Sequence, residues 1–170
     1  MNFCRRCGAS LSQINGHVYK CANGHTIYAN AAPAVAVFFL SPDNKQVTLS
    51  VRGIEPHKGM LDAFGGFVDG LETLEAAVAR ELQEELQLTP DQYDTPVYIA
   101  SGTDHYPYIG EEVSFISALY WSRLKPSTKL VPSDDVADAV TLPLHEVDLG
   151  KLHSDDIRLG IQKLRDMFPK

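Results

Sequence analysis

Three glutamates lie close together in the segment ARELQEELQL, residues 79–88. Apolar residues recur around them at helical spacing and predict a helix over residues 73–86, whose apolar face contains Leu74, Val78, Leu82 and Leu86. At about 100° per residue, Glu85 falls inside that face, Glu81 lies at its edge, and Glu84 lies beside Glu81. Like charges at this spacing repel each other, and burial raises the pKa of a carboxyl group.

Positive charge is needed to keep these carboxylates together beside an apolar face. Arg80 is the single cation in the segment, and we expect it to neutralise one of the glutamates. A divalent cation is the economical source of further charge. Oxygen ligands without a thiol or an imidazole favour Mg²⁺ or Mn²⁺. Taken alone, the segment also fits a solvated helix surface, so the preceding loop is needed to distinguish a metal site from such a surface.

The preceding loop completes a longer pattern: Gly66, five residues, Glu72, seven residues, and then the run Arg80-Glu81-Leu82-Gln83-Glu84-Glu85. The pattern resembles the signature of the Nudix hydrolases, and the resemblance extends from about Pro33 to the end of the chain. It implies an α+β fold, an α/β/α sandwich with a mixed β-sheet. The family usually has glycine where this chain has Gln87, a difference that bears on how the helix ends but removes no ligand.

The resemblance implies that Glu81 and Glu85 are the principal Mg²⁺ or Mn²⁺ ligands, with Glu84 as a third carboxylate. The metal would neutralise a diphosphate, polarise phosphorus and lower the pKa of the attacking water. The expected reaction is hydrolysis of the pyrophosphate bond in a nucleoside diphosphate linked to another moiety. A Nudix-like module that has lost catalysis and senses nucleotides is the alternative.

Other residues of the pattern are expected to support the metal ligands. In the family, Arg80 and Glu72 hold the ligand helix as an ion pair, and Glu72 can also enter the metal shell. Gly65 and Gly66 would let the loop backbone approach the phosphates and the metal closely.

The general base is expected either on the signature helix or on a later loop. The segment of residues 133–140 resembles the unit that carries an acidic ligand in the NADH pyrophosphatase branch, and Asp135 matches that position best. Glu111 and Glu112 are competitors for this role.

A second metal site is predicted near the N-terminus, where a C-x2-C-x13-C-x3-H pattern contains Cys4, Cys7, Cys21 and His25. The pattern resembles the zinc ribbon that precedes the Nudix domain in NADH pyrophosphatases, although Gly24 stands where the fourth cysteine is normal. Either His25 is a shifted fourth ligand of a structural Zn²⁺, or the site is degenerate and the thiols are free. His17 is a weaker substitute ligand. The expected domains are a zinc ribbon over residues 1–30 and a Nudix hydrolase domain over residues 31–170.

The substrate is less well defined by the sequence. The NADH pyrophosphatase branch carries an SQPWPFP-like motif after the signature, and residues 101–108 do not match it. ADP-ribose, NADH and other dinucleotides or nucleotide sugars therefore stay open. Tyr106 and Tyr108 are candidates for stacking on a base, and His57 and His105 for lining the cleft.

Composition and net charge limit the classes of binding partner. The chain has 170 residues and a net charge of −7, which disfavours nucleic-acid binding despite the zinc ribbon. It contains no apolar run of the about 20 residues that cross a membrane. The N-terminus does not resemble a signal peptide, and an odd number of cysteines indicates a cytoplasmic protein rather than a disulfide framework. Because related proteins often dimerise, the resemblance also allows a homodimer.

Pattern and turn signals predict further elements around the signature helix. Strands are expected at residues 34–40, 46–52, 97–101, 113–122 and 137–142. A last helix is expected over residues 155–168, with Ser154 as its N-cap.

Overall fold

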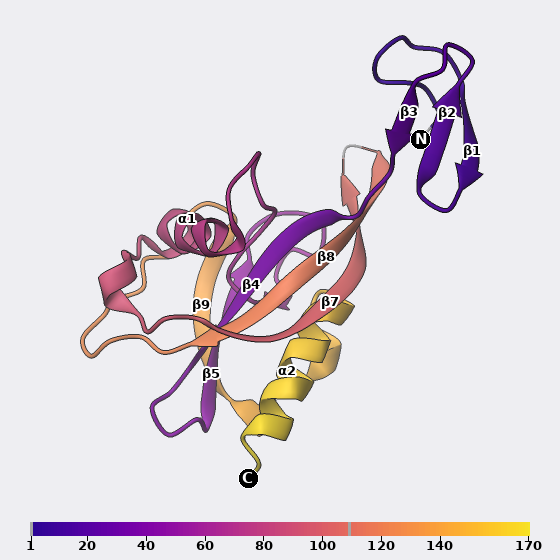
Figure 1. The fold of residues 1–170 in the computed structure, drawn as a ribbon. Coiled ribbons are helices and arrows are strands. Elements are labelled where there is room, and N and C mark those ends of the chain that lie inside the picture. The colour runs from indigo at the N-terminus through magenta and orange to yellow at the C-terminus, as the bar shows by residue number, and fades with distance from the viewer. Residues whose placement is uncertain (1, 109) are drawn as a thin grey trace. The chain divides into compact units, whose positions relative to one another are not determined.

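The computed structural model describes residues 2–108 and 110–170 and divides into two compact units, Met1–Ala31 and Ala32–Lys170. The first unit is an antiparallel sheet in the order β1-β2-β3 (Figure 1), made of β1 (Leu11–Asn15), β2 (Val18–Cys21) and β3 (Thr26–Tyr28). Its small interior contains Cys4, Cys21 and Ile27. Residues 1–30 carry little apolar periodicity because the strands are short and bury few side chains.

The second unit is built on a six-stranded sheet in the order β6-β5-β4-β8-β7, with β9 pairing along β5. The strands are β4 (Ala32–Leu40), β5 (Gln46–Arg52), β6 (Leu61–Asp62), β7 (Val97–Tyr108), β8 (Glu111–Ser122) and β9 (Val136–Pro143). β4 and β8 are parallel, while the other pairs are antiparallel. The predicted α+β class with a mixed sheet is confirmed. The strands are longer than predicted at β7 and β8, which form one long hairpin.

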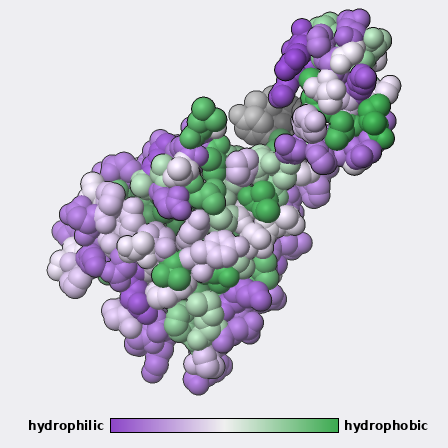
Figure 2. All heavy atoms as spheres, in the orientation of Figure 1, coloured by the Kyte–Doolittle hydropathy of each residue, from purple (hydrophilic) through white to green (hydrophobic). Residues whose placement is uncertain are grey.

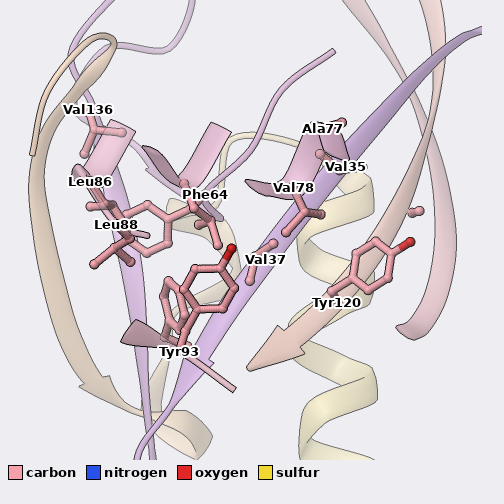
Figure 3. Close-up of a cluster of buried hydrophobic side chains, with 13 residues drawn as sticks. Val35, Val37, Phe64, Ala77, Val78, Leu86, Leu88, Tyr93, Tyr120 and Val136 are labelled. Carbon is pink, nitrogen blue, oxygen red and sulfur yellow. The ribbon is translucent and has the colours of Figure 1, made fainter. Parts of the chain in front are cut away.

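Two α-helices cover opposite faces of this sheet: α1 (Leu74–Leu86) and α2 (Asp155–Met167) (Figure 1). Alternate residues of β4 face the two layers. Val35, Val37 and Phe39 belong to the cluster under α1 (Figure 3), together with Val78, Leu82 and Leu86. Ala36, Phe38 and Leu40 belong to the cluster under α2, together with Ile157, Ile161 and Leu164. Period-two strand alternation thus produces the predicted α/β/α sandwich. Single 3₁₀ turns lie at Pro90–Gln92, Leu144–Glu146 and Leu149–Lys151.

The helix predicted at residues 73–86 has its expected ends, with Thr73 as the N-cap residue. The Ala76 N–H donates to the Thr73 hydroxyl at 3.2 Å. At the other end, Gln87 adopts φ 56° and its N–H donates to the Gln83 carbonyl. Gln87 therefore ends the helix in the left-handed conformation that glycine normally supplies. One expectation is wrong: Leu74 is 36% exposed and does not pack inward, although Ala77 in the same helical turn is fully buried.

The predicted N-cap of α2, Ser154, is the residue that precedes the helix, but its hydroxyl makes a different bond. It donates to the Asp156 carboxylate instead of accepting from a backbone N–H of the helix. The face of the molecule drawn in Figure 2 mixes hydrophilic and hydrophobic residues. Both described α-helices have 13 residues, too few to cross a bilayer.

Candidate active site

The segment that follows β6 replaces β5 beside β4 and brings the two glycines of the signature under α1. After its last pairs with β4 at Phe39 and Leu40, β5 leaves that strand. Residues 64–67 take its place, with bridges from Phe64 to Val37 and from Phe67 to Ala34. This segment lies against β4 at the side that α1 covers, so the loop backbone and the helix side chains meet there.

Both glycines occupy positions that no larger residue fits. Gly65 has φ 140°, and a Cβ there would lie 2.2 Å from the Val35 carbonyl oxygen. A Cβ on Gly66 would lie 2.6 Å from Oε1 of Glu81. A larger residue at Gly66 would therefore displace the Glu81 carboxylate from its observed position.

Glu81 and Glu85 are buried, as the helical wheel predicts. Their exposed fractions are 8% and 4%. The Gly65 N–H donates to Oε2 of Glu85 at 2.9 Å. Burial raises the pKa of Glu85 well above its usual range, and the negative charges of Asp135 and Glu81 raise it further. Burial also raises the pKa of Glu81, against the opposing effect of Arg80.

Arg80 compensates more charge than the sequence suggested. Its guanidinium pairs with Glu72 at 2.7 Å, with Glu81 at 2.8 Å and with Glu84 at 2.9 Å. The expectation that Arg80 neutralises a single glutamate is therefore wrong, because a planar fork with five N–H donors reaches several carboxylates at once. Within the described chain, Glu85 makes no such ion pair, although it is the most deeply buried of the four acids.

Glu72 has the supporting position that the family pattern implies. Besides its pair with Arg80, its Oε1 accepts from the Asp69 N–H at 2.7 Å, which closes the loop before the helix. The hydrogen bond from Arg80 is the main cause that lowers the pKa of Glu72. Arg80 also donates to the Phe67 carbonyl at 2.9 Å, so one side chain ties the loop to the helix.

Asp135 is brought to the same place by the loop before β9. The Ser133 N–H donates to the Glu85 carbonyl at 2.8 Å, and the Ser133 hydroxyl donates to the Glu84 carbonyl at 2.7 Å. These bonds attach the loop to the end of α1. Asp135 then lines a cavity together with Gly65 and Gly66, and its charge contributes to the raised pKa values of Glu81 and Glu85.

The competing acids are placed differently. Glu112 has a side chain that is 73% exposed and lies 3.9 Å from His105 on the β7–β8 hairpin, and it does not line the cavity. The side chains of Tyr108 and Glu111 lie outside the described part of the structure.

The cavity has a volume of about 200 Å³. Its described lining is Ala34, Val35, Ala36, Arg52, Asp62, Ala63, Gly65, Gly66, Phe67, Tyr106, Phe115, Ser117, Asp135, His153, Asp156 and Ile157. Tyr106 is at the wall as expected, and its ring packs edge-on against Phe67 at 5.9 Å between centroids. His57 and His105 are not in the described lining. The histidine in the wall is His153, whose Nδ1 lies 3.3 Å from Nδ1 of His57.

Sequence reasoning missed a polar cluster at the inner end of this cavity. Oδ2 of Asp62 accepts from Arg52 Nη1 at 2.8 Å and lies 3.2 Å from His153 Nε2. Burial raises the pKa of Asp62 to about 7 and lowers the pKa of His153 to about 4. The available sequence signal was a charged residue, Arg52, at the end of an otherwise uncharged strand.

The first unit brings the four N-terminal candidates together. The ligand atoms of Cys4, Cys7, Cys21 and His25 all lie within 4.8 Å of one another. His25 Nδ1 is 3.6 Å from the sulfurs of Cys4 and Cys21, and the sulfurs of Cys7 and Cys21 are 3.8 Å apart. Zinc bonds of about 2.3 Å to sulfur and about 2.0–2.1 Å to nitrogen separate tetrahedral ligands by roughly 3.6–3.8 Å. The four residues therefore fit a zinc ion.

Two further observations bear on this cluster. The Ala9 N–H and the Asn23 amide donate toward Cys7 and lower the pKa of its thiol to about 6, which favours the thiolate that binds metal. Gly24 has φ 82°, and its N–H donates to the Cys21 carbonyl at 2.9 Å. This turn aims His25 at the cluster. His17, the alternative ligand, packs near the Tyr28 ring instead.

The family model of the NUDIX domain matches residues 30–161. The chain belongs to the NUDIX family. An ADP-ribose pyrophosphatase from Methanocaldococcus jannaschii is 43% identical over 58 residues, which are 34% of each chain. The NAD-capped RNA hydrolase NudC from Deinococcus radiodurans is 35% identical over 89 residues, 49% of this chain and 31% of the relative. The chain thus matches about a third of the length of these curated relatives.

Solved NUDIX structures share the fold. A NUDIX hydrolase from Nitrosomonas europaea has a TM-score of 0.67 at 19% identity, covering 100% of this chain and 94% of the other. The NUDIX domain of Shewanella oneidensis NrtR, solved with ADP ribose, has a TM-score of 0.62 at 22% identity, covering 82% and 90%. At such identities the likeness concerns the fold. The family assignment supports the predicted enzyme class, a Nudix-type pyrophosphohydrolase.

Proposed function

We propose that the protein is a Mg²⁺- or Mn²⁺-dependent hydrolase that cleaves the pyrophosphate bond of a nucleoside diphosphate linked to another moiety. The observation that carries this proposal is Glu85, a buried carboxylate without an ion-pair partner among the described residues, next to Glu81 and Asp135. Three acids at one side of a cavity are costly without a cation. A divalent ion held by Glu81 and Glu85, with Glu84 beside them, removes that cost.

The metal ion and the residues around it have separate roles in the proposed reaction. When bound, the divalent ion neutralises diphosphate charge and activates water for attack at phosphorus. Gly65 and Gly66 leave the loop backbone open beside the ligands, while Arg80 and Glu72 fix the helix that presents them. The anhydride P–O bond breaks as the new P–O bond forms. The products are a nucleoside monophosphate and the phosphorylated second moiety.

Asp135 is our candidate for the general base. It lines the cavity next to Gly65 and Gly66, whereas Glu112 points into solvent on the hairpin. Asp135 would accept the proton of the attacking water, and its loop is attached to α1 through Ser133.

The first unit is proposed to be a zinc ribbon over residues 1–30 that holds a structural Zn²⁺ with Cys4, Cys7, Cys21 and His25. Four protein ligands leave no open coordination position, so this ion would stabilise the unit rather than catalyse. A ribbon followed by a NUDIX domain, residues 31–170, is the layout of the NADH pyrophosphatase branch. ADP-ribose and dinucleotides such as NADH are the proposed substrate class, in line with the names of the two curated relatives.

A substrate panel tests the proposal. The protein is incubated with Mg²⁺ or Mn²⁺ and ADP-ribose, NADH, FAD or 8-oxo-dGTP, and monophosphate products are measured by chromatography. We expect AMP from ADP-ribose or NADH, and none from the Glu85→Gln variant. Glu75→Gln is the matched control, because Glu75 lies exposed on the same helix. Binding without products across the whole panel would instead favour the nucleotide-sensing alternative.

A further inference from the structure

The cavity next to Glu81 and Glu85 carries a marked imbalance of charge. Its described lining includes three carboxylates, Asp62, Asp135 and Asp156, and a single arginine or lysine, which is Arg52. Arg80 lies outside this lining and is engaged with three glutamates. A diphosphate that enters the cavity therefore meets one permanent positive charge supplied by the described lining.

The Arg52 guanidinium is fixed but keeps donors free. Its Nε donates to the Pro56 carbonyl at 3.1 Å, and its Nη1 donates to Asp62 at 2.8 Å. Its Nη2 lies 3.5 Å from the Tyr106 hydroxyl, which is the limit of a hydrogen bond. Because a guanidinium has five N–H groups, these partners leave N–H groups of both Nη atoms for a ligand.

A register shift in the β5–β9 ladder lies next to Arg52. β5 and β9 pair residue by residue from Gln46 to Val51, and the register then shifts so that Arg52 lies opposite Val136. Next to the shift, the Gly53 N–H donates to the Asp135 carbonyl at 2.6 Å. Bulges reorient side chains and are frequent beside active sites. The extra residue belongs to β9, just after the segment that carries Asp135, and Arg52 and Asp135 both line the cavity.

Asp62 holds the guanidinium from the opposite side. Its Oδ1 accepts from the Ala63 N–H at 2.8 Å, while its Oδ2 receives Arg52 and faces His153 at 3.2 Å. Its side chain is 15% exposed, so it cannot turn outward to follow solvent. Both carboxylate oxygens of Asp62 thus have partners within the protein, and one of these partners is Arg52.

We propose that Arg52 binds substrate directly, through the phosphate that Glu81 and Glu85 do not serve, and that Asp62 is a positioning residue for it. This inference rests on the proposed function, since it assigns a second anchor to the same diphosphate. A planar fork that donates two parallel N–H groups suits phosphate oxygens. Two anchors at opposite ends of a diphosphate fix which of its bonds faces Asp135.

A measurement of substrate binding without hydrolysis separates a role of Arg52 in binding from a role in catalysis. In a Glu81→Gln/Glu85→Gln background with EDTA present, the metal site and its repulsion are removed, and ADP-ribose binding is measured by calorimetry. We expect Arg52→Lys in this background to weaken binding about tenfold or more, which is the size of a charge-assisted hydrogen bond. Lysine keeps the charge but loses the fork. The inference is wrong if the proteins with and without Arg52→Lys bind ADP-ribose with the same affinity, or if neither gives a measurable heat of binding.

The matched control is Arg165→Lys. Arg165 is a partly buried arginine that donates to the Leu144 and Val147 carbonyls and is not in the described cavity lining. Arg52→Lys should raise KM more than it lowers kcat and leave thermal unfolding equal to that of the control. An unchanged KM, or a loss that Arg165→Lys reproduces, contradicts the role of Arg52.

The role of Asp62 is tested by a double-mutant cycle. Asp62→Asn should raise KM in the wild-type background and have little further effect once Arg52 is lysine, because it acts through that residue. Additive effects on KM would show that Asp62 does not position Arg52. A wild-type protein that hydrolyses nothing in the panel refutes the proposed function instead, and the EDTA titrations still decide the role of Arg52.

Discussion

The sharpest expectation concerns Glu85→Gln, which should abolish activity and yet stabilise the metal-free protein. Glutamine keeps the shape of the side chain, and its Oε1 can accept the Gly65 N–H bond that Glu85 accepts at 2.9 Å. The change removes a buried negative charge that faces Asp135 and Glu81 and has no described ion-pair partner. A buried charged group without compensation costs about 1–3 kcal/mol or more. We expect a gain of that size in the free energy of unfolding at pH 8 in EDTA.

The sign of the pH dependence follows from the raised pKa of Glu85. The folded protein holds the Glu85 proton more tightly than the unfolded chain does, so this group stabilises the fold fully below its unfolded pKa of about 4.3. That contribution is lost as pH rises through the raised folded pKa. The advantage of Glu85→Gln over wild type should therefore grow with pH.

Mg²⁺ should reverse the order of stability. An ion that binds the folded wild type raises its unfolding temperature with concentration, and the variant that lacks Glu85 gains less. At about 2–4 °C per kcal/mol, the expected effects are several degrees in opposite directions in EDTA and in Mg²⁺. Thermal unfolding with Glu75→Gln as control measures both, and AMP release from ADP-ribose measures activity, which should fall at least a hundredfold. A variant that is active, or less stable than wild type in EDTA, refutes the reasoning.

Four further perturbations have defined outcomes. Gln87→Gly should raise the free energy of unfolding by about 1 kcal/mol, since it relieves a left-handed residue at φ 56°; thermal unfolding measures it. Cys7→Ser should lose one equivalent of zinc by elemental analysis and disorder residues 1–30 by NMR, with the active-site resonances of the second unit unchanged. Arg80→Lys should raise the Mg²⁺ concentration for half-maximal activity about tenfold, because lysine cannot hold three carboxylates at once. Asp135→Asn should lower kcat by about 10²–10⁴ if it is the base, and its pH–rate profile should lose the acidic limb; an unchanged profile excludes this role.

Local patterns were enough to predict both α-helices, most strands of the second unit and the buried glutamates, because the apolar spacing of α1 fixes which side chains face the sheet. The same spacing failed at Leu74, which is exposed although Ala77 in the same helical turn is fully buried. The three ion pairs of Arg80 depend on where the loop of residues 67–72 folds back, which no helical wheel contains.

Long-range pairing explains the other omissions. Arg52, Asp62 and His153 come from three separate segments, and only the register of β5 with β6 and β9 and the bridge from Leu61 to Leu152 bring them together. The Cys and His spacing near the N-terminus was informative because a zinc site is encoded locally by two turns.

The three ion pairs of Arg80 have a consequence for how a metal ion binds and leaves the site. Nη1 donates to Oε1 of Glu81 and leaves Oε2 of that carboxylate for a cation, so the ion adds to the contacts of Arg80 instead of replacing them. The guanidinium also keeps Glu72 and Glu84 in place while the ion binds and dissociates. Between turnovers we expect the helix and loop that carry the metal ligands to stay folded, and the fraction of sites that hold Mg²⁺ to follow the free Mg²⁺ concentration.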